Sequence, residues 1–345
     1  MNALYLLPRI DIDFRGVFHN NDTIKDMYEL SSQKDKVEVM GIPDELNIVT
    51  GAFGYTGKYI AQRLLSLGKK VRTITGHPNR ANPFGDQVSA VPFNFDNQVE
   101  LTKSLQGATT LYNTYWIRFS YKQDTFDMAV EHTKALIRAA EESGVRRIVH
   151  ISITNASEAS PFPYFRGKAI LEKAISQSSL SYAIIRPTVL FGHEDILINN
   201  IAWLLRRFPI FAIVGSGDYK LQPVFVEDVA ELAVNAGQCE ENMIMDAVGP
   251  EIYPFHEMVQ LIASKIHGKA RMVHLRPELA LFFSRMVGYL VNDVVLTRDE
   301  VYGLMSDLLV SRYPPTGKTR LSDWLTWNAD IIGIKYASEL GRHYR

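Results

Sequence analysis

The sequence predicts an α/β protein, a doubly wound parallel sheet with a smaller and mostly helical C-terminal region. Between residues 46 and 190, short β-branched runs alternate with segments whose apolar residues recur at helical spacing. This alternation is typical of a parallel sheet that is covered by helices on both faces. A glycine-rich turn separates the first strand from the first helix, which is a second indication of the same fold.

Each element of the sheet follows from its local pattern. Asn47-Ile-Val-Thr reads as a buried strand, and the helix after it, over 55–67, carries its apolar residues on one face and ends before Gly68. Further strands are expected over 71–75, 88–93, 109–114, 147–152 and 181–186. The helices between them are expected over 98–105, 123–143 and 164–176.

After Pro187 the alternation becomes irregular. Helices are expected over 196–207, 226–236, 254–265 and 277–291, with short strands near residue 224 and over 243–246. We expect this region to lie over the carboxyl edge of the sheet, where parallel sheets bind their ligands. The expected substrate pocket is lined by residues 113–116 and 189–203.

Composition excludes several classes of protein. The 345 residues are 46% hydrophobic and 22% charged, which suits a globular chain, and a net charge of −1 gives no basic excess for nucleic acid. The one cysteine, Cys239, excludes an internal disulfide, and no Cys/His cluster predicts a metal site. No apolar run reaches the roughly 20 residues of a membrane span. A cytoplasmic location is expected, with peripheral membrane association as a further possibility.

The turn from Thr50 to Gly57, Thr-Gly-Ala-Phe-Gly-Tyr-Thr-Gly, has glycines at a G-x-x-G-x-x-G spacing. A strand turns sharply into a helix here, and absent side chains let the backbone approach a pyrophosphate at the helix N-terminus. The flanking strand–helix–strand context makes this a nucleotide-binding motif. The residues expected to hold the pyrophosphate are Thr50, Gly51, Phe53, Gly54, Tyr55, Thr56 and Gly57.

The end of the second strand indicates which dinucleotide is bound. NAD sites place an acid about 20 residues after the turn to accept from the ribose hydroxyl. Residues 70–80 contain no acid, whereas His77 and Arg80 could face a 2′-phosphate and Gly76 occupies the discriminating position. NADP(H) is therefore favoured over NAD(H). Other contacts are expected from residues at the ends of the later strands: Asn94, Phe95, Asp96, Asn113, Thr114 and Pro187.

These assignments divide the chain into three parts. Residues 1–45 form an N-terminal extension that resembles neither a secretory signal nor, given its frequent acids, a mitochondrial transit peptide. Residues 46–190 are the dinucleotide-binding, Rossmann-type domain. Residues 191–345 are a substrate or partner region interleaved with the sheet edge.

Tyr164 and Lys168 stand four residues apart on a predicted helix, so their side chains share one face. A cationic lysine beside the phenol would lower its pKa and let the tyrosine exchange a proton while hydride moves. The alternative is that Lys168 contacts ribose and Tyr164 only packs. Ser152 and Thr154, on one face of the preceding strand, are the candidate hydroxyl partners.

Together these motifs resemble the extended and atypical short-chain dehydrogenase/reductases. Ile185-Arg-Pro-Thr-Val-Leu-Phe-Gly192 resembles the R-P-x-x-x-x-G run of the epimerase/dehydratase and NmrA-like families, and Phe225-Val-Glu-Asp-Val-Ala230 their strand-to-helix element. Residues 221–229 and 296–300 also resemble the nucleotide-binding accessory subunits of respiratory complex I. That subgroup implies a tightly held NADPH, without catalysis in some members.

Three functions remain open from the sequence. The first is an NADP(H)-dependent oxidoreductase that reduces a small carbonyl or quinone-like substrate. The second is a binding module that holds NADPH without turnover, as a sensor or assembly protein. The third, a sugar-nucleotide epimerase or dehydratase, is least favoured because such enzymes retain NAD and the acid after the second strand is missing.

A last feature is the apolar C-terminal segment 279–291, with a second apolar stretch over 204–211. Such segments predict either burial in the core or a surface that meets a protein partner or a membrane. Burial is the favoured expectation. The oligomeric state does not follow from the sequence.

Overall fold

The computed structural model describes residues 45–344, so the expected extension lies outside the described residues apart from Glu45. The central sheet has seven parallel strands in the order β11-β6-β5-β4-β1-β2-β3. These strands are β1 (Leu46–Thr50), β2 (Lys70–Thr75), β3 (Val88–Pro92), β4 (Ala108–Asn113), β5 (Arg147–Ile151), β6 (Ser181–Pro187) and β11 (Met243–Ala247). The strand order reverses between β1 and β4, so the predicted doubly wound fold is confirmed.

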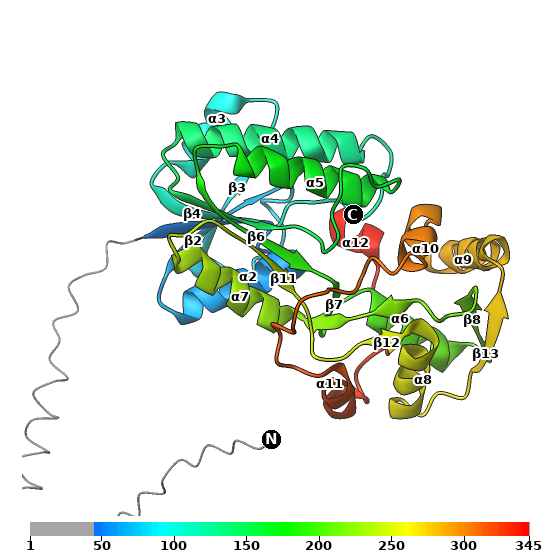
Figure 1. The fold of residues 1–345 in the computed structure, drawn as a ribbon. Helices are drawn as coiled ribbons and strands as arrows, with labels where there is room; N and C mark the ends of the chain where they lie inside the picture. The colour runs from blue at the N-terminus through cyan, green and yellow to red at the C-terminus, as the bar shows by residue number, and fades with distance from the viewer. Residues whose placement is uncertain (1–44, 345) are drawn as a thin grey trace, which may run out of the picture. The chain divides into compact units, whose positions relative to one another are not determined.

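Helices cover both faces of this sheet (Figure 1). One face carries α2 (Tyr55–Ser66) and α7 (Val226–Gln238), and the other carries α3 (Gln98–Leu105), α4 (Phe126–Glu142) and α5 (Pro163–Ser176). Alternation along the strands fills both cores: Val49 and Val149 pack toward α2 and α7, whereas Ile48 and Ile148 pack toward α4. The β-branched runs are therefore buried on both sides, as the sequence predicts.

Local capping explains where two helices begin. The Thr125 hydroxyl accepts from the Met128 amide at 3.2 Å, so α4 starts at Phe126, three residues after its expected start. Pro163 occupies the first turn of α5, where its missing N–H costs nothing.

The C-terminal region contains the four expected helices as α6 (Leu197–Arg207), α7, α8 (Phe255–Lys265) and α9 (Pro277–Val291). It also contains α10 (Arg298–Leu304), α11 (Leu321–Asn328) and α12 (Glu339–His343), which the sequence did not predict. Three two-stranded sheets complete it: β7 (Val189–Phe191) with β10 (Pro223–Phe225), β8 (Ile210–Val214) with β13 (Arg271–Leu275), and β9 (Lys220–Leu221) with β12 (Tyr253–Pro254). A 3-10 turn, η1 (Gly85–Gln87), precedes β3.

One expectation is wrong. The apolar segment 279–291 lies in α9, and six of its large side chains are exposed rather than buried. The reason is that α9 packs inward through Ala280 and Leu281, which join the apolar cluster of Val214 and Val301. Gly288 lies close to the backbone of Asp293, and the large side chains on the other side of the helix stay outside. None of the described helices is long and apolar enough to cross a membrane.

Candidate functional site

The glycine-rich turn joins β1 to α2 at the carboxyl edge of the sheet. Gly51 has φ +64°, and its amide donates to Ile74 O at 2.9 Å, which ties the turn to β2. A Cβ on Gly57 would lie 2.4 Å from Gly51 O, so only glycine lets α2 start this close to the turn. The structure thus contains the tight strand–turn–helix connection that the sequence predicts, and its role in nucleotide binding stays a prediction.

The Thr50 side chain fixes the neighbouring strand end. Its buried hydroxyl donates to Asn113 Oδ1 at 3.1 Å and accepts from the amides of Thr114 at 2.7 Å and Tyr115 at 3.0 Å. The Thr114 hydroxyl in turn donates to Thr50 O at 2.6 Å. Thr50, Asn113 and Thr114 thus hold the ends of β1 and β4 together at the topological switch point.

Several polar groups at this edge are left for a ligand. The N-cap of α2, Gly54, makes no side-chain cap hydrogen bond, and the first turn of α2 contains no acid. The amides near Phe53 and Thr56 therefore offer a positive helix end to an anion. The Tyr55 hydroxyl and Trp116 Nε1 are buried without a partner among the described residues. Of these groups, the amides at the start of α2 fit an anion such as the diphosphate of a dinucleotide.

The loop after β2 is the expected ribose-phosphate end of the site. Residues 76–80, among them His77 and Arg80, line a cavity of about 360 Å³. Arg80 Nη1 donates to Arg342 O at 2.5 Å, so the C-terminal segment reaches this loop. The Arg342 guanidinium also lies 5.5 Å from the ring centre of Tyr55, at the start of α2.

The remaining predicted contacts lie at the ends of β3, β4 and β6. Asn94, after β3, has φ +49°. The ring of Phe95 stacks on those of Phe93 and His132, with ring centres 4.6 Å and 4.2 Å apart, and Asp96 follows it in the chain. Asn113 Nδ2 lies 3.0 Å from His150 Nδ1. Pro187 O accepts from the Thr154 amide at 3.0 Å. The structure thus brings all of the predicted cofactor positions to one edge of the sheet, and their binding role stays a prediction.

Tyr164 and Lys168 both lie on α5, but their environments differ. Lys168 Nζ donates to Ile151 O at 2.7 Å and lies 4.6 Å from the ring centre of Trp116. Burial lowers the pKa of Lys168 to about 7, although Glu172 opposes the shift. Burial raises the pKa of Tyr164 well above its ordinary value, and carboxylates raise it further. The expected lowering of the tyrosine pKa by Lys168 is therefore wrong here.

The two candidate hydroxyls lie beside carboxylates. Ser152 Oγ donates to Glu172 Oε1 at 2.5 Å, and Thr154 Oγ1 donates to Asp246 Oδ2 at 3.1 Å. The residue between them, Ile153, lines the large cavity of the site. A catalytic role for either hydroxyl stays a prediction, and it requires that hydroxyl to leave its carboxylate.

That cavity has a volume of about 570 Å³ and an apolar lining that includes Phe119, Ile153, Tyr164 and Leu304. Val189, Ile196 and Leu197 belong to its lining, as expected, but residues 113–116 do not. Residues 296–300, 303 and 304, in α10 and just before it, are part of the wall instead. The expected pocket is thus only partly right, because α10 lies far away in the sequence.

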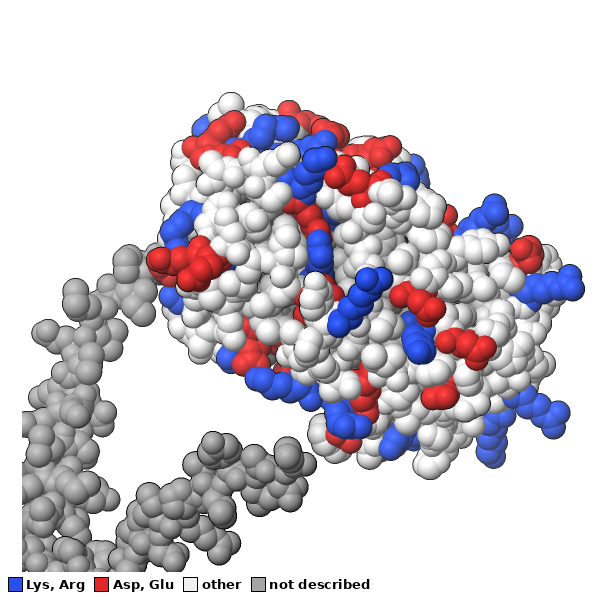
Figure 2. Space-filling view, in the orientation of Figure 1, with Lys and Arg blue, Asp and Glu red and all other residues white. Residues whose placement is uncertain are grey.

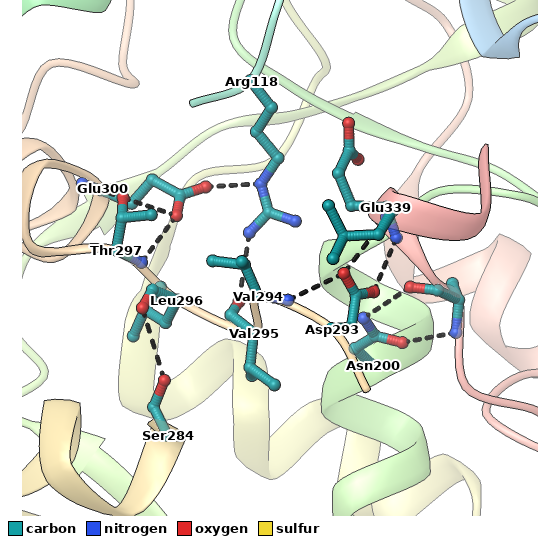
Figure 3. Close-up of polar contacts among 12 residues, drawn as sticks. Arg118, Asn200, Ser284, Asp293, Val294, Val295, Leu296, Thr297, Glu300 and Glu339 are labelled. Atoms are coloured by element: carbon teal, nitrogen blue, oxygen red, sulfur yellow. Dashed lines mark hydrogen bonds and ion pairs between the residues drawn. The ribbon is translucent and has the colours of Figure 1, made fainter. Parts of the chain in front are cut away.

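Arg118 and Glu300 line one side of this cavity as a partly buried ion pair. Figure 3 shows their polar contacts with the neighbouring residues. Arg118 Nε donates to Glu300 Oε1 at 2.5 Å, and Arg118 Nη2 donates to Val295 O at 3.2 Å. Burial opposes the charge on Arg118, but Glu300 and Glu339 raise the pKa of this arginine above its ordinary value. Burial raises the pKa of Glu339, which Arg118 opposes.

Neighbouring polar residues anchor the C-terminal helix. Asp293 accepts from the amides of Glu339 at 2.8 Å and Leu340 at 3.1 Å, and Asn200 exchanges two hydrogen bonds with the backbone of Ala337. Sequence reasoning missed Arg118 and Arg342 as residues of this site. The capping box from Thr297 to Glu300 was the available signal for α10, and no local pattern pairs Glu300 with Arg118.

Comparisons with known proteins agree with this geometry. Residues 51–198 match the model of the NAD(P)H-binding family. This part of the chain is therefore similar to NAD(P)H-binding domains, as the glycine-rich turn predicts. Subunit 9 of the NADH dehydrogenase (ubiquinone) 1 alpha subcomplex of Arabidopsis thaliana, a mitochondrial protein, is 27% identical over 282 residues, 76% of this chain and 70% of that protein.

Other similar proteins include the corresponding subunit of Mus musculus, 28% identical over 64% of this chain and 60% of that protein. Among solved structures, the NADPH-dependent quinone oxidoreductase of Escherichia coli has a TM-score of 0.64 at 19% identity, covering 82% of this chain and 99% of that one. The triphenylmethane reductase of Citrobacter sp., complexed with NADP(H), has a TM-score of 0.62 at 18% identity, covering 83% and 99%. These structures show the shared fold.

Proposed function

We propose that this protein holds NADP(H) at the carboxyl edge of its sheet and serves as an accessory subunit of a respiratory NADH dehydrogenase, without turning the dinucleotide over. The observation that carries the proposal is the contrast between two halves of the site. The turn from Gly51 to Gly57 has the close backbone approach that a diphosphate site needs. In contrast, the Ser152 hydroxyl donates to Glu172 and burial raises the pKa of Tyr164, so these two side chains are not arranged for proton transfer. The names of the subunit 9 relatives support the accessory role.

In this proposal each part of the edge binds one part of the dinucleotide. The amides at the start of α2 hold the diphosphate, and Lys168 holds the nicotinamide ribose. His77 and Arg80 face the 2′-phosphate, because residues 70–80 place no carboxylate there to repel it. NADP(H) is therefore preferred over NAD(H).

The location of the relatives bears on where the protein works. Both subunits are named as mitochondrial, which supports a mitochondrial location for this chain over the cytoplasmic one expected from its composition. A mitochondrial location also suits an accessory subunit of the respiratory chain.

Titration calorimetry of nucleotide-free protein with NADPH and NADH tests the binding half of the proposal. Binding of NADPH that is clearly tighter than binding of NADH is the expected result. Equal or stronger NADH binding would refute the preference and would favour the epimerase alternative. If folded protein binds neither nucleotide, the proposed function itself is refuted.

The proposed role as an accessory subunit is tested on native gels of mitochondrial membranes. We expect the tagged chain to migrate with NADH dehydrogenase activity. Migration only at the size of the free chain would contradict this role, whatever the nucleotide result.

A second candidate function is reduction of a lipophilic carbonyl or quinone-like molecule, and the apolar cavity that Tyr164 lines favours it. A bound nicotinamide would supply hydride. The raised pKa of Tyr164 keeps its phenol protonated at neutral pH, so this residue would donate the proton to the substrate oxygen.

Single-turnover oxidation of NADPH with short-chain quinones and aldehydes tests this candidate. If the protein is a reductase, Tyr164→Phe abolishes the oxidation and keeps NADPH affinity. Undiminished turnover in this variant would remove Tyr164 from the chemistry, and absence of turnover in the wild type would leave the binding role alone.

A further inference from the structure

Helix α9 lies beside α10 at the right of Figure 1. It presents an apolar face to solvent. Tyr289 is 89% exposed and Leu290 is 75% exposed. Four more large apolar side chains on this helix are between 47% and 56% exposed: Leu279, Phe282, Phe283 and Met286. No other described helix exposes so many large apolar side chains.

These side chains share one side of the helix. At 3.6 residues per turn they fall within an arc of roughly 120°. The opposite side carries Ala280 and Gly288, which pack inward, and a Cβ on Gly288 would lie 2.7 Å from Asp293 O. The outward orientation of the apolar arc is therefore fixed by close packing of the inner side.

The surroundings of this arc are basic. Between residues 267 and 299 the exposed charged side chains are five basic and two acidic, and the third acid, Asp293, is buried. The basic ones are Lys269, Arg271, Arg276, Arg285 and Arg298, and the acidic ones are Glu278 and Asp299. Figure 2 shows basic side chains bordering uncharged surface at the end where Figure 1 places α9.

An apolar helical face with aromatic side chains and bordering arginines matches the chemistry of a lipid–water interface. The phenol of Tyr289 and the guanidinium of Arg285 can reach the headgroups while Phe282 and Leu290 enter the acyl region. The basic border complements an anionic headgroup layer, whereas a purely apolar protein contact would not need it.

We propose that α9 docks this protein on an anionic phospholipid surface. The helix lies in the plane of the interface, with its apolar arc toward the lipid. The docking also brings the cavity near the membrane, because Ser284 on α9 donates to O of Leu296, a residue of the cavity wall, at 3.4 Å. A lipophilic substrate or ligand would then reach the cavity from the lipid; only this last point rests on the proposed function.

Flotation of the purified chain with phosphatidylcholine vesicles, with and without phosphatidylglycerol, tests the proposal. We expect flotation only with the anionic vesicles, weakened by salt. The combined variant Phe282→Gln, Phe283→Gln, Tyr289→Gln and Leu290→Gln should lower partitioning by about tenfold or more, since it removes four buried apolar groups. The charge variant Arg276→Glu with Arg285→Glu should abolish the preference for anionic lipid.

A matched control replaces exposed apolar residues elsewhere. Trp327, Ile331 and Ile334 are 76%, 56% and 53% exposed, so their change to Gln should leave flotation unaltered. Thermal melting confirms that each variant is folded. NADPH titration of the same variants, expected to be unchanged, keeps the test separate from the proposed function.

The proposal is overturned if the folded wild type does not float with anionic vesicles, or if the four-residue variant floats as well as the wild type. Sedimentation gives a further check. Self-association that the same variant removes, in the absence of flotation, would assign the face to a second copy of this chain instead.

Discussion

Replacement of Gly57 by alanine tests the nucleotide site at its most constrained point. The added Cβ would lie 2.4 Å from Gly51 O, and ordinary contacts start near 3.4 Å, so α2 must move away from the turn by about 1 Å (3.4 − 2.4). The three nearest atoms, Gly51 O, Gly51 C and Thr50 O, are all backbone atoms, which cannot rotate aside. Overpacking of this kind costs about 1–3 kcal/mol of folding stability.

The shift also moves the amides of the first turn of α2 away from the proposed diphosphate position. A hydrogen bond to a charged group contributes about 1.5–3 kcal/mol. Loss of one such bond therefore predicts NADPH binding that is weaker by about 10- to 100-fold. Titration calorimetry measures the affinity, and thermal or urea unfolding measures the stability.

Gly68→Ala is the matched control. Gly68 has φ +70° with nothing within 4 Å of its added Cβ, so alanine there costs about 1–2 kcal/mol through backbone strain alone. We expect similar destabilisation and unchanged NADPH affinity in this variant. Unchanged affinity in the folded Gly57→Ala variant would refute the assignment of this turn to the diphosphate.

Three further predictions follow from buried or bridging groups. Thr50→Val should lower stability by about 2–4 kcal/mol, because the amides of Thr114 and Tyr115 lose their acceptor in a buried place; urea unfolding checks this. The folded pKa of Lys168, about 7, lies below the unfolded value, so stability should rise from pH 7 toward pH 10, and Lys168→Met should flatten that slope. Arg342→Ala should speed NADPH dissociation several-fold in stopped-flow, whereas Arg342→Lys should retain most of the effect, since the guanidinium stands over the start of α2. A rate equal to that of the wild type would remove the C-terminal segment from the nucleotide site.

The sheet and the nucleotide turn follow from the sequence because local patterns determine them. The central strands β1 and β5 are buried on both faces, and Gly54 and Gly57 stand where the backbone of Gly51 leaves little or no room for a side chain. Neither feature depends on a residue distant in the sequence. The later helices α6 to α9 were predictable for the same reason.

Only the tertiary structure decided the rest. The pairing of β8 with β13 and the contact of Arg118 with Glu300 join segments that are far apart in the chain, and no periodicity encodes such a pairing. Burial likewise reversed the expected pKa shift of Tyr164, because desolvation depends on what surrounds the phenol. The composition of α9 gave its hydrophobicity, but the inward packing of Ala280 and Leu281 determined that most of its large side chains face outward. Residue type sets what a side chain favours, and the arrangement of the whole chain sets whether water, protein or another surface surrounds it.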